Sequence, residues 1–195
     1  LQIGAQIDLT WKARLEEHLG SFQVELIRSR TANVMNDRLL LAGMLSSTTL
    51  INRFFPVGQA YKQFYESSEN LFDLLQFPDI WALGYLKWEL EFLATLGFGL
   101  DLEKCAVTGS TADLKFISPK SGRAVSQAGA GEWSSKLLPF PVAASGQGNS
   151  LEDILDGLKV SQFFLERKVL ATFGMEHLPA ARFRFISLLE KKIRN

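Results

Sequence analysis

Cys105 is the only cysteine of the chain, and it begins a stretch with the layout of a zinc ribbon. A ribbon of the form C-x2-C-x15–20-C-x2-C closes two short knuckles around one tetrahedral metal ion. Counted from Cys105 at that spacing, the other ligand positions fall on Thr108, Ser126 and Gly129. None of these three can supply a thiolate or an imidazole, so we expect neither zinc nor any other cofactor.

The scaffold of a ribbon remains around these positions. LKFI (114–117) and RAVS (123–126) are predicted as two short strands, and the Pro and Gly residues between them favour a turn. The cations of this hairpin are Lys115, Lys120 and Arg123. They form a candidate contact for nucleic acid, and a solvated turn is the alternative.

Residues that could carry catalysis are sparse. His18 and His177 lie far apart in the sequence, and Cys105 has no base or nucleophile motif beside it. Gly97-Phe98-Gly99 ends a predicted helix, whereas a phosphate-binding glycine loop opens one. We therefore expect the protein not to be an enzyme.

Composition narrows the class of protein. The 195 residues are 47% hydrophobic, which is enough for a substantial core, and 21 cations balance 21 acids. Nucleic-acid binding must then depend on local patches of charge. A single cysteine excludes an internal disulfide, and no apolar run is long enough to span a membrane. We expect a soluble cytoplasmic protein with no membrane partner.

The first thirty residues alternate between apolar and polar, which is typical of two strands. The apolar positions run over Ile3 to Leu9 and again over Phe22 to Leu26. Two strands do not form a stable sheet alone, and the chain begins at Leu1 rather than Met. We expect that an N-terminal part precedes this sequence.

From residue 33 onward the apolar period becomes helical. Helices are predicted over 34–55, 61–75 and 79–96, and the third is apolar nearly all round, as in the centre of a bundle. Ser150 with Asp153 favours another helix start, and Gly174 a helix end. The last helix carries Arg182, Arg184, Lys191, Lys192 and Arg194, which dipole compensation and solubility explain without a partner.

Several short motifs occur together in a fixed order. They are Leu96-Gly97-Phe98-Gly99, Asp101-Leu102, Cys105-Ala106 and Leu137-Leu138-Pro139-Phe140-Pro141. This order resembles the C-terminal region of the RecO family of bacterial recombination mediators. Some members of that family hold zinc at the four ribbon positions and others do not.

The resemblance implies an α+β fold that is mostly helical. Residues 1–31 would be the last strands of an oligonucleotide/oligosaccharide-binding (OB) barrel, and residues 32–195 a helical domain. A degenerate zinc-ribbon-like hairpin would be inserted at about 100–130.

The resemblance also implies a function in recombinational DNA repair through the RecF pathway. Such a protein would bind single- and double-stranded DNA and the single-strand DNA-binding protein (SSB). It would partner RecR, assist RecA loading and anneal strands without nucleotide hydrolysis. It would be cytoplasmic and associated with the nucleoid during repair.

Cations near the barrel strands are the main candidates for DNA binding. OB barrels bind single strands by combining a cationic groove with aromatic side chains on which bases stack. Trp11 and Phe22 are the nearby aromatic residues. The candidate cations are Lys12, Arg14, Arg28, Arg30 and Arg38, together with Lys120 and Arg123 of the ribbon hairpin.

Lys87 is a cation on the otherwise apolar third helix. The family docks the acidic C-terminal tail of SSB, which needs a cation beside an apolar pocket. Lys87 with Tyr85 and Trp88 is the candidate site for that tail. The alternative is a solvated edge with a Lys87–Glu91 pair, worth about 0.3 kcal/mol.

Two rival functions remain open. One is a helical protein-interaction module without DNA binding, whose apolar grooves bind a peptide. The other is a degenerate zinc-ribbon regulator that has lost both metal and DNA binding. The dependence of binding affinity on salt concentration distinguishes a DNA-binding protein from these rivals. A protein that binds phosphates loses affinity steeply as the salt concentration rises.

Overall fold

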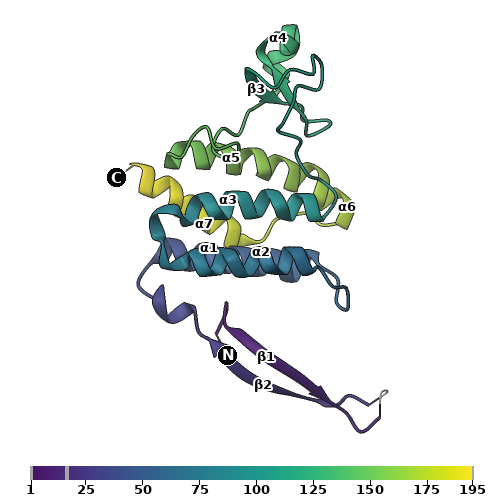
Figure 1. Cartoon of the computed structure of the whole chain (residues 1–195), viewed down its shortest axis with the longest axis vertical. Coiled ribbons are helices and arrows are strands. Elements are labelled where there is room, and N and C mark those ends of the chain that lie inside the picture. Colours follow the sequence, from purple (N-terminus) through teal and green to yellow (C-terminus); the bar gives the residue numbers. More distant parts are fainter. Residues whose placement is uncertain (1, 16–17, 195) are drawn as a thin grey trace.

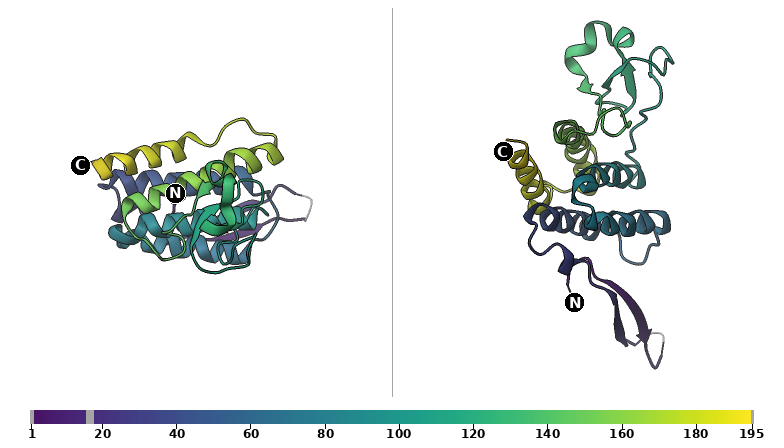
Figure 2. Two further views of the ribbon diagram at one scale, coloured as in Figure 1. Left: turned by 90° about the horizontal axis from the view of Figure 1, so that it is seen from above. Right: turned by 60° about the vertical axis from the view of Figure 1, so that its left-hand side comes forward.

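The computed structural model describes residues 2–15 and 18–194. Three parts follow one another along the molecule (Figure 1): an N-terminal β-hairpin, a helical bundle, and an insert on the far side of the bundle. The insert comprises residues 101–141, between two helices of the bundle. Hairpin and insert therefore lie on opposite sides of the helices (Figure 2).

The hairpin pairs β1 (Gln6–Lys12) with β2 (Ser21–Arg28) in antiparallel register, with Trp11 opposite Phe22. The apolar residues of both strands share one face: Ile7, Leu9, Trp11, Phe22, Val24 and Leu26. Most of them are exposed, because nothing within the described residues covers this face. The described part of residues 1–31 is thus a two-stranded sheet, and the predicted OB barrel is not confirmed.

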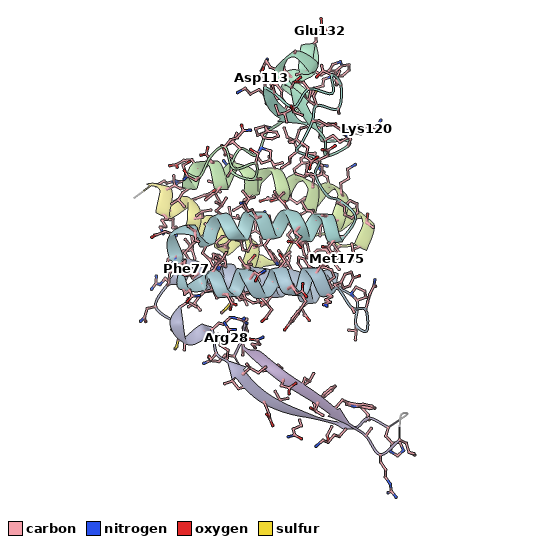
Figure 3. All side chains as sticks on the ribbon, viewed as in Figure 1. Arg28, Phe77, Asp113, Lys120, Glu132 and Met175 are labelled. Carbon is pink, nitrogen blue, oxygen red and sulfur yellow. The ribbon has the colours of Figure 1, made fainter. Side chains whose placement is uncertain are left out.

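Ion pairs hold the base of the hairpin, where Figure 3 labels Arg28, against the bundle. The guanidinium of Arg30 lies 2.9 Å from Glu69 Oε2 and 2.9 Å from Asp73 Oδ1. Arg28 lies 2.8 Å from the same Asp73 oxygen. Both acids belong to α2 (Lys62–Asp73), so the last turns of that helix position the hairpin.

The long helices of the bundle begin and end at residues that favour those positions. Asp37 caps α1 (Arg38–Phe54), since its carboxylate accepts the N–H groups of Leu39 and Leu40. Pro78 opens α3 (Pro78–Thr95), where its fixed φ suits the first turn. Gly97, at a φ of 89°, ends α3 as bonds run from Phe98 N to Leu93 O and from Gly97 N to Ala94 O.

A buried α3 confirms the predicted central helix. It contacts α2 on one side and α5 (Leu151–Phe164) on another. Trp81, Leu86 and Phe92 of α3 are fully buried among side chains of the other helices. The last helix, α7 (Ala180–Arg194), packs along α1.

The helix that starts at the Ser150–Asp153 capping box continues as far as Phe173. It runs from α5 through a π-helical turn at Leu165–Val169 into α6 (Leu170–Phe173). Gly174, with a φ of 62°, ends it as predicted. None of the helices in the described residues is long and apolar enough to cross a membrane.

The insert contains the predicted strand pair. β3 (Leu114–Ile117) pairs antiparallel with β4 (Ala124–Ser126), and β5 (Leu138–Pro139) from the LLPFP segment joins the other edge of β3. Near the bundle, Ile117 and Phe140 join the main core. Farther out a separate small cluster of buried residues surrounds Cys105, next to α4 (Gln127–Ala130).

Candidate functional site

A groove between α1 and α7 combines cations with an apolar floor. Its volume is about 680 Å³. The cations are Arg38, Arg184 and Lys191, and the other lining residues are Leu41, Ala42, Leu45, Ser187 and Leu188. We call this surface the α1/α7 groove.

Helical spacing brings the groove residues onto facing sides of the two helices. Arg184, Leu188 and Lys191 stand at i, i+4 and i+7 and so share one face of α7. Arg38, Leu41 and Leu45 stand at i, i+3 and i+7 and so share one face of α1. Each helix therefore presents leucines beside its cations.

The groove is electrostatically open to an anion. Among the described residues, no acidic side chain forms a salt bridge with its three cations. Arg38 stands in the first turn of α1, where the helix dipole is positive, and the carboxylate of Asp37 is already engaged by backbone N–H groups. A ligand that presents both a carboxylate and an apolar side chain would match the cations and the floor together.

The predicted peptide site around Lys87 is not assembled at the surface. Lys87 itself is exposed, but Tyr85 is 0% and Trp88 only 2% accessible to solvent. The indole N–H of Trp88 donates to Ser68 Oγ, and the Tyr85 hydroxyl pairs with Ser46 Oγ at 2.7 Å. Tyr85 and Trp88 are therefore part of the core, and of the three residues predicted for the peptide site only Lys87 is exposed.

The alternative for Lys87 is not confirmed either, since no Lys87–Glu91 pair is formed in the described structure. Glu91 instead accepts a hydrogen bond from Ser67 of α2.

The predicted DNA-binding cations do not form one patch. Lys12 and Arg14 are exposed on the hairpin, and Lys12 Nζ donates to Gln23 Oε1. Arg28 and Arg30 pair with acids of α2, and Arg30 is only 4% exposed, which removes it from any DNA surface. Arg38 belongs to the α1/α7 groove.

The cations of the insert do not form one patch either. Arg123 pairs with Asp101 at 3.3 Å, and Lys115 with Asp113 at 3.8 Å. Lys120, labelled in Figure 3, lines a small cavity of about 260 Å³ where the insert meets the bundle. Lys168, from the π-helical turn, lines the same cavity.

The four ribbon positions lie together around the sulfur of Cys105. Sγ accepts hydrogen bonds from the backbone N–H of Ser126 at 3.2 Å and from its hydroxyl at 3.3 Å. The backbone N–H of Thr108 also donates to Sγ at 3.4 Å. Ser126 Oγ in turn accepts the N–H of Gly129 at 3.1 Å.

These contacts control the ionisation of Cys105. Burial favours the neutral thiol and would raise its pKa, but hydrogen bonds from Ser126 and Thr108 together lower the pKa to about 6. Sulfur here is chiefly an acceptor of hydrogen bonds.

The donor set does not fit zinc. A structural zinc ion takes four thiolate or imidazole ligands, whereas these positions offer one thiol, two hydroxyls and a residue without a side chain. Elsewhere in the described part of the chain, no group of three His, Cys, Asp or Glu side chains is placed to hold a metal ion.

Sequence reasoning missed a buried ion pair. Arg182 of α7 was attributed to the solvated basic end of the chain, but it is fully buried against Glu89 of α3. Their two hydrogen bonds are both 2.8 Å long. The groove was missed too, although leucines spaced with cations on one face of α7 were visible in the sequence.

The fold and these sites define a mixed α/β protein, about half helical, with small antiparallel sheets and open surface sites. The family described as "Recombination protein O C terminal" matches residues 35–174. The DNA repair protein RecO of Ruegeria sp. (strain TM1040) is 46% identical over 194 residues, which are 99% of this chain and 80% of that relative. The RecO of Jannaschia sp. (strain CCS1) is 47% identical over 193 residues, 99% of this chain and 79% of the relative.

The chain belongs to the RecO family. The shared name of these relatives supports a role in DNA repair. No solved structure matches the chain.

Proposed function

We propose that the protein is a recombination mediator in DNA repair that docks the acidic C-terminal tail of SSB in the α1/α7 groove. The observation that carries this proposal is the combination of a leucine floor with three cations that form no salt bridge to any acid among the described residues. The tail ends in a carboxylate beside an aromatic ring, so the cations would bind its acids and the leucines its ring. Lys87 has an exposed charge, but the two rings predicted to form its apolar pocket, those of Tyr85 and Trp88, are buried in the core.

DNA binding is the second part of the proposal. Trp11 and Phe22 lie opposite each other on one face of the hairpin and are 45% and 63% exposed, while Lys12, the next residue of the strand, points to the other face. The exposed rings suit the stacking of unpaired bases, worth about 1–3 kcal/mol per base, and the exposed cations Lys12 and Arg14 would bind phosphates at the same end of the hairpin. Lys120 with Lys168 would offer a separate contact to phosphates.

The remaining steps follow from family membership. The protein would act with RecR, assist the loading of RecA and anneal strands, without catalysing a reaction itself. It would bind double-stranded as well as single-stranded DNA and work in the cytoplasm. These steps need surfaces for a protein and for DNA at once, and the groove and the hairpin lie in separate parts of the molecule.

Fluorescence anisotropy of a labelled SSB tail peptide tests the groove. Reversal of two of its charges, Arg184→Glu with Lys191→Glu, should weaken binding by at least about tenfold, equal to ~1.4 kcal/mol. Lys192→Glu with Arg194→Glu is the matched control, because it makes the same two charge reversals on α7 at residues that do not line the groove. If the control variant loses as much affinity for the peptide, or if only Lys87→Glu loses affinity, the groove is not the binding site of the tail.

Labelled single-stranded DNA tests the hairpin in the same assay. Affinity should fall steeply with salt, and Lys12→Glu with Arg14→Glu should lower it further. Peptide binding without any DNA binding at low salt would instead favour the protein-interaction module.

A further inference from the structure

The insert keeps the arrangement of a four-ligand metal site without the ligands. Ser126 Oγ lies 3.3 Å from Cys105 Sγ and 3.4 Å from Thr108 Oγ1. A Cβ atom added to Gly129 would stand 2.9 Å from Cys105 Sγ and 3.2 Å from Ser126 Oγ. All four positions of the ribbon spacing therefore converge on one point.

Those separations approach the dimensions of a zinc site. With Zn–S bonds of about 2.3 Å, the sulfur atoms of a tetrahedral site stand about 3.8 Å apart. Only the side-chain chemistry is missing, since the backbone already brings the positions to this spacing.

Where a zinc ribbon would have bonds from its ligands to the metal ion, this insert has hydrogen bonds to Cys105 Sγ. Cys105 Sγ accepts the N–H groups of Val107, Thr108 and Ser126, together with the Ser126 hydroxyl. The same serine joins the last position through Gly129 N–H. One sulfur atom thus links both knuckles, and we call this arrangement the sulfur cluster.

The outer part of the insert needs such a link. Among the described residues, its own hydrophobic cluster has three buried members, Cys105, Val125 and Ala130, with Leu114, Phe116 and Leu137 partly buried against them. A core of that size does not stabilise a fold, which is why small domains of this kind depend on a metal or a disulfide.

We propose that the sulfur cluster replaces zinc in this protein: the insert folds without metal, and cysteines at the three other positions would restore a zinc site. Ser126 is the central residue, because its backbone and side chain bond to the sulfur while its hydroxyl also caps α4. The four positions of the ribbon spacing then stay close together, and hydrogen bonds to one sulfur atom hold them there.

Metal content and chelation test the first half of the proposal. The full chain, purified with zinc in the medium, should carry far less than one zinc per molecule by plasma mass spectrometry. Its melting temperature should not change when a strong zinc chelator is added. Stoichiometric zinc, or a clear loss of stability on chelation, would overturn the proposal.

The triple variant Thr108→Cys, Ser126→Cys and Gly129→Cys tests the second half. It should bind about one zinc per chain, give the cobalt(II) spectrum of tetrahedral thiolates, and become sensitive to the chelator. A folded variant that binds no metal would show that the positions do not form a site.

Crowding at Gly129 could prevent the triple variant from folding. The double variant Thr108→Cys with Ser126→Cys adds no atom there and supplies three thiolates. It should still bind cobalt(II) with thiolate absorption, and a folded double variant without that absorption would reject the geometry.

Discussion

The bundle and the N-terminal hairpin distribute charged and apolar side chains in opposite ways. The bundle buries a complete ion pair, Glu89 with Arg182, in its interior. The hairpin leaves Leu9, Phe22 and Leu26 more than half exposed. Charges tolerate burial only when their partners are fixed, and apolar side chains remain exposed only where nothing is available to cover them.

The buried pair is fixed by groups from several helices. Tyr85 and Ser161 both donate to the carboxylate of Glu89, from α3 and α5. Arg182 donates further to the carbonyl of Leu158 and to Gln162 Oε1, each at 2.9 Å. Burial lowers the pKa of Arg182, but the carboxylate of Glu89 more than offsets it, so the guanidinium stays charged.

The hairpin has no comparable interior, and its position depends on contacts at its base. Arg30 pairs there with Glu69 and Asp73 and lies over the ring of Phe72 at 5.9 Å. The bundle is thus stabilised by its own packing, whereas ion pairs with α2 hold the hairpin in its position. Substitutions in the two regions should therefore differ in kind.

The largest effect is expected from Arg182→Met. Removal of one partner leaves Glu89 buried without a counter-charge, which should lower the free energy of unfolding by about 3–5 kcal/mol. Arg184→Met is the matched control, because Arg184 is exposed two residues away. Urea denaturation followed by far-ultraviolet circular dichroism measures both.

If Arg182→Met lowers the free energy of unfolding by less than about 1 kcal/mol, the bundle does not require the Glu89–Arg182 ion pair. The double variant Glu89→Leu with Arg182→Met sharpens the result. It removes both charges, so it should be more stable than the single variant if an uncompensated charge causes the loss.

A smaller and more local effect is expected from Arg30→Met. The loss of its charged hydrogen bonds to Glu69 and Asp73 should cost about 1–2 kcal/mol of hairpin docking while the bundle stays folded. Amide hydrogen exchange should accelerate in β1 and β2 and remain unchanged in α3. Lys12→Met, an exposed change within the hairpin, is the control.

If amide hydrogen exchange in Arg30→Met accelerates equally throughout the chain, hairpin and bundle unfold as one unit. Arg30 would then not hold the hairpin separately from the bundle. The same result would remove the contrast between the two regions.

Features that depend on neighbouring residues were predictable from the sequence. The Ser150–Asp153 capping box and the ends at Gly97 and Gly174 lie where the local chemistry places them. The same holds for the strand pair 114–117 with 124–126, whose turn residues adjoin it. Each requires only a few residues in a row, so the sequence specifies it directly.

Features that depend on distant residues were not predictable. Arg182 and Glu89 are 93 positions apart, and nothing near Arg182 distinguishes it from its solvated neighbours. Tyr85 and Trp88 belong to a helix that is apolar nearly all round, so its period could not tell which rings reach the surface. The α1/α7 groove likewise exists only once the two helices pack together.

A third kind of contact, the sulfur cluster, should make the stability of the protein depend on pH. The pKa of Cys105 is lowered from its usual value near 9 to about 6, so the folded state favours the thiolate. A lowered pKa adds stability that is complete above the unfolded value and is lost as the pH falls through the folded one. The stability advantage of the native chain over Cys105→Ala should therefore grow between pH 6 and pH 9.

Melting temperatures of both proteins across that range measure the difference, and the ultraviolet absorbance of the thiolate, with Cys105→Ala as the blank, reports the ionisation itself. The pKa of about 6 already includes the opposing effect of burial, and one titrating group can add at most about 1.4 kcal/mol of stability per pH unit. An advantage that stays constant with pH would mean that Cys105 acts as a neutral thiol. The hydrogen bonds of Ser126 and Thr108 would then stabilise the insert by their geometry alone, without the charge that distinguishes this cluster from an ordinary buried cysteine.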